Sequence, residues 1–162
     1  MLKHILHVSN FNANLVRTFM EAIPDDKMCV QPAGLPNHPA WQVGHLALVR
    51  SMVAKQAAAF DAGYPEAWSP LFGRGSTPLA DRAAYPSKAD LMATYNRGHE
   101  AAIKAVSALT PAQLEGTHTL ERLKPFLPTL GDLITQMLIG HDGLHLGQLG
   151  DWRRAMGFPR VI

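Results

Sequence analysis

The sequence contains little of several features that mark specialised classes of protein. Cys29 is the only cysteine among 162 residues, which excludes an intrachain disulfide framework and a zinc site built from several cysteines of one chain. Charged residues make up only 17% of the chain, with 15 Lys and Arg against 13 Asp and Glu, and neither sign forms a long run. This balance argues against a nucleic-acid partner and against a membrane-surface partner.

Long hydrophobic runs are also missing. No stretch approaches the roughly 18 apolar residues of a membrane span. The first fifteen residues carry His4, His7 and several Ser and Asn side chains in place of the apolar core of a signal peptide. Hydrophobic residues still make up 47% of the chain, which is enough for a core at this length. We therefore predict one cytoplasmic globular domain over residues 1–162.

Helical periodicity dominates the chain, and no segment reads as a strand. Four helices are predicted, over about residues 3–23, 39–60, 87–106 and 129–156, which makes the fold class all-α. Asn37 or His38 is the expected cap of the second helix and Ser87 that of the third. Four helices of this length most simply form an antiparallel bundle. The connection 61–86 is too long for a bundle turn, and its Trp68, Leu71 and Phe72 favour a packed loop over a disordered one.

Eight histidines stand out in this composition. His141 and His145 lie four residues apart in the last predicted helix, so their imidazoles project from one side. HExxH helices hold a metal at this spacing, but the residues between the two histidines here include no glutamate. Their face also carries Ile134, Leu138, Gln148 and Trp152. Such an interior pair needs either a shared metal or carboxylate and water partners, because an unsatisfied buried polar group costs about 1–3 kcal/mol.

A third metal ligand must come from another helix. His45 is the best candidate, because it lies early in the second helix on one face with Trp41 and Leu48. His99 occupies an apolar stripe of the third helix and is a further candidate, either as a ligand or as a group that supports one. The other histidines are expected at the surface or in loops: His4, His7, His38 and His118.

Three histidines with one vacant position form the arrangement of a catalytic metal site. Imidazole accepts several divalent metals, so zinc and nickel are the first candidates, and iron, manganese and copper stay open. A di-iron site would need two Glu-x-x-His motifs, and only Glu115–His118 matches, with Gly116 inside it. We reject that site. A haem site is disfavoured, because two histidines one turn apart would compete for one face of the iron.

Several further side chains are assigned roles from their positions. Gln148 shares the histidine face, where it can bond a ligand or substrate or fix a histidine. Asp142 points about 100° from His141 and is expected to be solvated or to cap a loop. Arg74 is expected to be solvated, with an anionic substrate as the alternative. A glycine row nearly opposite the histidines predicts a closely packed backbone from this subunit or a homodimer partner, unless it only relaxes the helix: Gly140, Gly143, Gly147 and Gly150.

The chain carries two motifs, Trp41-Gln-Val-Gly-His45-Leu and His141-Asp-Gly-Leu-His145-Leu-Gly-Gln148-Leu followed by Arg153 and Gly157. With them it resembles the DinB/YfiT-like superfamily of four-helix-bundle metalloenzymes. The resemblance implies His45, His141 and His145 as metal ligands, a long crossover loop after the second helix, and a homodimer. The family often has arginine before the motif glycine, where this chain has Leu146, so no role of that arginine carries over.

Several members of that family transfer low-molecular-weight thiols, and the resemblance implies a small-molecule substrate and a cellular thiol here. A metal with an open position lowers the pKa of a bound thiol, which leaves a thiolate to attack an epoxide, halide or alkene. A hydrolase that activates water is one alternative. A bundle stapled by a non-catalytic metal, or a stress-response binding module, is another.

Overall fold

The computed structural model describes residues 2–161. These residues are helical, with no strand among them, as the periodicity predicts. Three long helices are α1 (Leu2–Glu21), α2 (Pro39–Ala58) and α4 (Lys88–Ser107). The fourth long segment is α6 (Leu130–Thr135), a π-helical turn η5 (Gln136–His141) and α7 (Asp142–Ala155). Short elements connect them: η1 (Asp25–Lys27), η2 (Glu66–Trp68), α3 (Ser69–Phe72), η3 (Arg82–Ala84), α5 (Pro111–Leu114) and η4 (Glu121–Leu123).

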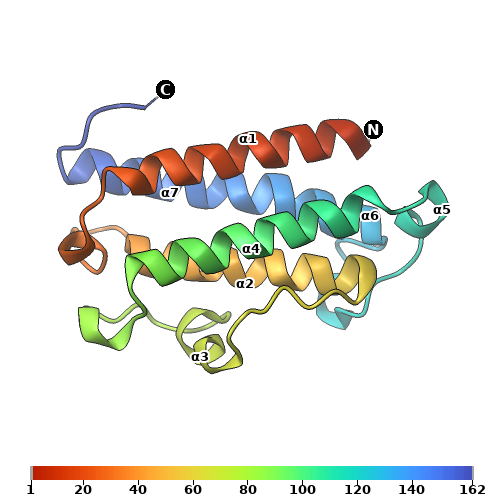
Figure 1. Cartoon of the computed structure of the whole chain (residues 1–162), viewed down its shortest axis with the longest axis horizontal. Coiled ribbons are helices and arrows are strands. Elements are labelled where there is room, and N and C mark those ends of the chain that lie inside the picture. Colours follow the sequence, from red (N-terminus) through yellow and green to blue (C-terminus); the bar gives the residue numbers. More distant parts are fainter. Residues whose placement is uncertain (1, 162) are drawn as a thin grey trace.

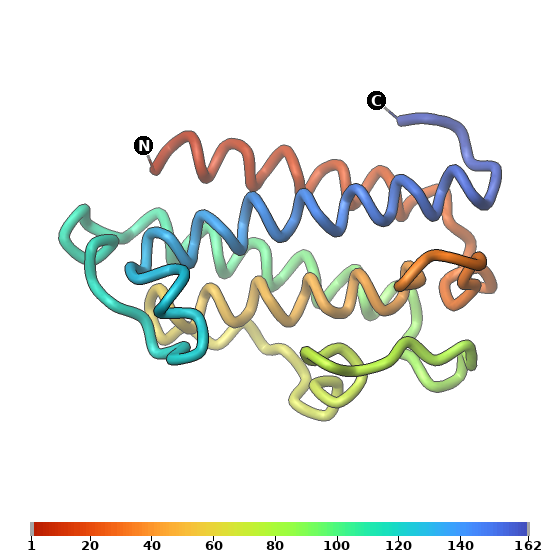
Figure 2. The backbone as a smooth tube through the Cα atoms, turned by 180° about the vertical axis from the view of Figure 1, so that it is seen from behind, coloured from red at the N-terminus to blue at the C-terminus, as the bar shows by residue number. Residues whose placement is uncertain are grey.

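The long helices lie side by side in two pairs (Figures 1 and 2). α1 runs in the same direction as α6 and α7, whereas α2 and α4 both run the opposite way. α2 and α4 pack against each other along much of their length. They are parallel because the connection 59–87 returns to the end of the molecule where α2 began. The simple antiparallel arrangement therefore holds for α1 and α2 but not for α2 and α4.

Side-chain caps set the points at which the long helices begin. His38 Nδ1 accepts a hydrogen bond from the backbone N–H of Trp41 at 3.2 Å, and Pro39 occupies the first helical position, where no N–H is needed. Ser87 accepts from the N–H of Asp90 at 3.1 Å. Both caps are the predicted ones. No helix within residues 2–161 has the length and hydropathy required to cross a bilayer.

The connection after α2 is packed on the core, as its aromatic residues predict. Phe72 is fully buried, and Trp68 and Leu71 pack against the same core cluster. α3 can approach α2 closely because position 44 is glycine. A Cβ at Gly44 would overlap the ring of Phe72. This close approach places the backbone of α3 directly beside the next residue of α2, His45.

Within residues 2–161 no backbone packs on the glycine row of the last helix, so the expectation of a close backbone from this subunit was wrong. A Cβ at Gly143 or Gly147 would meet nothing within 4 Å. At Gly150 it would reach only the ring of Phe19, at 3.8 Å, and at Gly140 only a neighbouring glutamine side chain. The row lies nearly opposite the histidine face, and the bundle packs against the histidine side.

Gly143→Ala and Gly44→Ala are therefore expected to change stability in opposite directions. Gly143→Ala should raise the free energy of unfolding by about 0.5–1 kcal/mol, because alanine costs less backbone entropy in a helix and has space here. Gly44→Ala should lower it by about 1–3 kcal/mol through overpacking against Phe72. Urea titrations of both variants measure the difference. Equal effects at the two positions would contradict this account of the packing.

Candidate metal centre

Three imidazoles converge where α2 faces the junction of η5 and α7. His45, His141 and His145 each offer a ring nitrogen, and these three atoms lie within 4.8 Å of one another. Nε2 of His45 is 3.2 Å from Nε2 of His141. Two nitrogens bound to one tetrahedral zinc at about 2.0–2.1 Å lie about 3.3 Å apart. The spacing therefore suits a single ion held by both rings.

Hydrogen bonds on the far side of two rings fix their orientation. Nδ1 of His45 donates to the backbone carbonyl of Phe72 at 2.7 Å, so Nε2 keeps its lone pair. Nδ1 of His145 donates to Oε1 of the buried Gln42 at 3.4 Å. Trp41 stacks on His45, with ring centroids 4.7 Å apart and planes at 11°. Partners of this kind hold the tautomer and ring direction that a metal ligand needs.

Burial keeps these histidines in the form that binds metal. Loss of solvation lowers the pKa of His45, and it lowers the pKa of His141 to about 4 and that of His145 to about 3. The neighbouring imidazoles lower the last two further. All three rings are therefore neutral at pH 7. His145 is buried, whereas His45 and His141 are partly exposed, so the centre is reachable from solvent.

A buried ion pair lies behind the centre and connects all the long helices. Arg50 of α2 and Asp142 of α7 are fully buried and paired with each other. The same guanidinium donates to Ser9 of α1 at 3.2 Å and to Nδ1 of His99 in α4 at 2.5 Å. Nε2 of His99 in turn donates to Oδ1 of Asn10 at 2.9 Å. We call these five residues the Arg50 network.

The Arg50 network corrects the expectation for Asp142 and places His99. Asp142 is fully buried rather than solvated. α7 packs against both α1 and α2, so a side chain about 100° around the helix from His141 also points into the bundle. His99 is not among the three converging rings but supports the guanidinium behind them. Its pKa falls to about 3 through burial and the nearby Arg50 charge, so it remains a neutral acceptor.

The remaining candidates lie around the centre or away from it. Gln148 accepts a hydrogen bond from Asn37 at 3.0 Å, which ties α7 to the segment before α2. Arg74 is exposed in the connection, and His4 and His7 are exposed on α1. His38 and His118 are buried rather than at the surface, because the ring of each bonds backbone groups in a loop: Leu79 and Trp41 for His38, Leu127 and Leu120 for His118.

The buried histidines predict that the metal-free protein loses stability in mild acid. In the unfolded chain they take up protons below pH 6.5, whereas the folded values of His99, His141 and His145 lie near 3–4. Between about pH 6.5 and 4 the folded state therefore binds fewer protons than the unfolded state. The free energy of unfolding consequently decreases as the pH is lowered through this range. Asp142 opposes the trend, because burial raises its pKa to about 6 although Arg50 limits the rise.

Urea titrations of chelator-treated protein at pH 7, 6 and 5 measure this slope. We expect a net difference of about two protons, and each proton contributes up to about 1.4 kcal/mol per pH unit. His99→Gln should remove about one of them. A free energy of unfolding that does not change between pH 7 and 5 would show that these rings are not buried neutral bases.

Sequence reasoning missed the groups that hold the converging imidazoles in place. Gln42 lies inside the first motif and three residues before His45, yet it received no role. Arg50 is a charged residue directly after the apolar run Leu46–Val49 of α2, and this was the available signal for a buried partner. The carbonyl of Phe72 gives no signal in sequence, because its position depends on how α3 packs on Gly44.

Comparisons with known proteins show which family the chain belongs to. No curated protein matches the chain significantly. The family model of the DinB superfamily matches residues 10–149, a region that contains all three converging histidines and most of the Arg50 network. The chain therefore belongs to the DinB superfamily.

Proposed function

We propose that this chain is a metal-dependent enzyme in which His45, His141 and His145 hold one divalent ion that activates the thiol of a small cellular molecule. The supporting observation is the convergence of three neutral imidazole nitrogens within 4.8 Å. Zinc and nickel are the first candidates, followed by iron, manganese and copper. The unit that carries the site is one four-helix domain over residues 1–162, with the connection 59–87 as its crossover.

The donor set fits a metal better than it fits a purely structural hydrogen-bond cluster. The His45–Phe72 bond leaves the Nε2 lone pair of His45 facing Nε2 of His141. A hydrogen bond between His45 and His141 would leave the ring of His145 without a partner on the side that faces them. One ion satisfies all three rings at once.

When bound, the ion would act as a Lewis acid that keeps a thiol ionised at neutral pH. The residues of this chain do the positioning. Phe72 and Gln42 hold the rings of His45 and His145 from behind. Trp41 covers one face of His45 and excludes water from it.

The surroundings favour an incoming thiol over an activated water. Among the described residues no carboxylate joins the three imidazoles, so the ion alone would have to ionise the bound nucleophile. A free thiol starts from a pKa of about 8.5, against about 15.7 for water, so the ion would ionise a thiol more readily. The proton of the thiol would pass to the solvent. The chain's own Cys29 cannot be this thiol, because it is buried in the core and burial raises its pKa. The thiol must therefore come with the substrate.

A cavity that none of the three histidines lines offers space for the second reactant one helical turn from His45. A cavity of about 730 Å³ begins at Leu48, one helical turn beyond His45, and continues along Met52 and Gln56 of the same face of α2. Ser69, the first residue of α3, also lines it. This volume is within the range of small-molecule sites. We assign the cavity to the electrophile.

A metal that only staples the bundle is the second candidate. The Arg50 network weighs against it, because that network already connects α1, α2, α4 and α7 without a metal. The partial exposure of His45 and His141 also favours exchangeable coordination. The homodimer and the cytoplasmic location stay predictions.

Cobalt substitution tests the proposed function. The protein loaded with Co²⁺ should develop a sulfur-to-metal absorption band when cysteine or glutathione is added, and it should speed the reaction of that thiol with a bimane halide. Serine and S-methylcysteine are the matched controls, since each lacks a free thiol. A cobalt spectrum that is unchanged by every thiol at millimolar concentration would refute thiol activation.

A further inference from the structure

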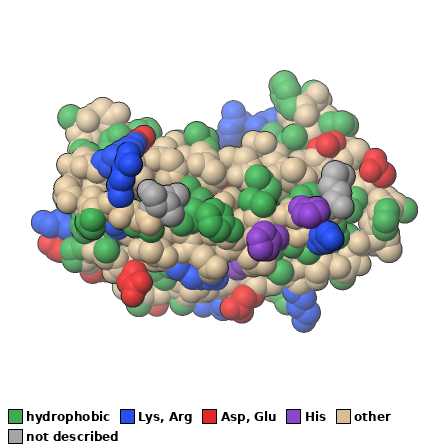
Figure 3. All heavy atoms as spheres, turned by 90° about the horizontal axis from the view of Figure 1, so that it is seen from above, with side chains coloured by type: hydrophobic (Ala, Val, Ile, Leu, Met, Phe, Trp, Pro, Cys, Tyr) green, Lys and Arg blue, Asp and Glu red, His purple; other side chains and the backbone are tan. Residues whose placement is uncertain are grey.

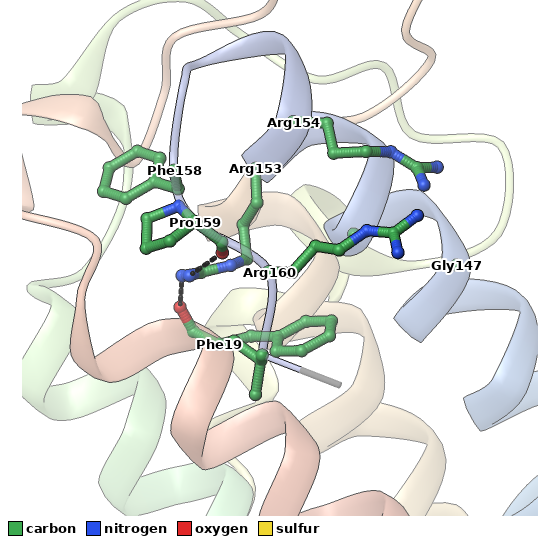
Figure 4. A pocket seen from close by; sticks show the side chains of 9 residues that line it. Phe19, Gly147, Arg153, Arg154, Phe158, Pro159 and Arg160 are labelled. Atoms are coloured by element: carbon green, nitrogen blue, oxygen red, sulfur yellow. Dashed lines mark hydrogen bonds between the residues drawn. The ribbon is translucent and has the colours of Figure 1, made fainter.

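A second hollow lies on the other side of α7 from the histidines. Its volume is about 310 Å³, and it is enclosed where the chain beyond α7 folds back over the last turn of α1 (Figure 4). Gly147 and Gly150 line it, and these positions are nearly opposite the histidine face of the helix. The other lining groups are apolar or basic: Phe19, Phe158, Pro159, Val161, Arg153, Arg154 and Arg160.

Arg153 places a buried positive charge in the wall of this hollow. The residue is only 4% exposed and has no carboxylate partner within residues 2–161. Its guanidinium donates to the carbonyls of Phe19 at 2.8 Å and Pro159 at 3.1 Å (Figure 4). It also lies 5.4 and 5.2 Å from the ring centroids of Phe19 and Phe158. These groups orient the guanidinium without cancelling its charge, which is costly to bury alone.

Two further guanidiniums border the same hollow. Those of Arg154 and Arg160 extend to one side of the pocket, beside Gly147 (Figure 4). Arg154 is paired with Asp151, whereas Arg160 has no ion pair in the described part of the chain. Basic side chains are also visible at this end of the face formed by α1 and α7 (Figure 3). Among residues 2–161, these three cations have one carboxylate partner, Asp151, which leaves two of the guanidiniums without one.

The glycines explain why there is room beside these charges. A Cβ at Gly147 would meet nothing within 4 Å, and one at Gly150 would meet only the ring of Phe19. Each glycine costs about 1 kcal/mol relative to alanine in a helix interior. No segment of the described chain fills the space that they leave. The surface of α7 at Gly147 is therefore open beside the guanidiniums of Arg154 and Arg160, whereas that of Arg153 points toward Phe19 and Pro159 (Figure 4).

We propose that this hollow binds a small phosphate monoester with an apolar substituent. A dianionic phosphate would balance the charges of Arg153 and Arg160, the two arginines without a carboxylate partner. The paired N–H groups of a guanidinium can donate to two phosphate oxygens at once. Phe19 and Phe158 provide the apolar wall for the substituent. The volume is at the lower limit of small-molecule pockets, about 300–1,000 Å³, which restricts the ligand to a compact one. The site uses none of the metal ligands and does not rest on the proposed reaction.

Calorimetric titration with phenyl phosphate tests the site. Arg160→Ala should weaken binding by at least about tenfold, because a charge-assisted hydrogen bond is lost. Asp151→Asn should tighten binding several-fold, since it releases Arg154 from its partner. Gly147→Leu should abolish binding by filling the hollow while leaving all three arginines in place. Arg122→Ala, which removes an exposed arginine of η4, is the matched control and should change affinity less than twofold.

His145→Ala separates this site from the metal centre, because a phosphate can also bind a metal. Phenyl phosphate binding that disappears in His145→Ala but survives in Arg160→Ala would overturn the proposal. So would binding of a single-stranded oligonucleotide in place of phenyl phosphate, or equal affinity for benzoate, which carries one charge. Circular dichroism and metal content of each variant exclude unfolding as the cause of a loss.

Discussion

His145→Ala is expected to lower metal affinity by more than about a hundredfold, so that the variant loses its ion during desalting. His145 is the most buried of the three converging histidines, and its Nδ1 donates a hydrogen bond to Gln42. Even the loss of a partner behind a metal ligand typically costs 10–100-fold in affinity, and the loss of the ligand itself should cost more. Metal content after desalting, measured by mass spectrometry, gives the result directly. His45→Ala and His141→Ala should behave in the same way.

His7→Ala is the matched control for this prediction. His7 is exposed on α1 and lies outside the converging set, so the control variant should keep about one ion per chain. Stoichiometric metal in His145→Ala would show that the ion, if any, binds elsewhere. The melting temperature of the metal-free protein provides a second measurement. A melting temperature only a few degrees below that of the metal-loaded protein supports a catalytic ion. Complete unfolding on metal removal would support an ion that only stabilises the bundle.

The sequence predicted that His45, His141 and His145 converge, because part of the signal is local. A four-residue spacing puts His141 and His145 on one side of a helix whatever the tertiary structure. His45 required an assumption about packing, and the structure brings it to 3.2 Å from His141. The caps at His38 and Ser87 were also predictable, since a cap depends on three or four consecutive residues.

Tertiary packing decided what the sequence could not predict. The inward direction of Asp142 depends on α7 contacting two helices, which a helical wheel cannot express. The π-helical turn Gln136–His141 adds a residue per turn just before the site, and no residue pattern signalled it. The support from Phe72, which lies 27 residues after His45, depends on where α3 packs. The failures for Asp142 and Phe72 share one cause, because each contact is set by a neighbouring element.

The second large effect is expected for Arg50→Met, which should lower the free energy of unfolding by about 3–5 kcal/mol. The substitution keeps the length of the apolar stem but leaves the Asp142 carboxylate buried without a cation. It also removes the donor to His99 and to Ser9. Asp142→Leu should be destabilising for the converse reason, since it leaves the guanidinium unpaired. Urea unfolding of chelator-treated protein isolates these effects from the metal.

The double variant Arg50→Met with Asp142→Leu shows whether the pair stabilises the fold or only becomes costly when broken. Replacing a buried ion pair with apolar side chains is often neutral, so the double variant should be more stable than either single one. Asp142 directly follows His141, so the double variant should still bind metal, but more weakly, because the start of α7 is no longer held to α2 by charge. Additive losses across the cycle would mean that the two residues act independently and that the network does not position the ligand helix.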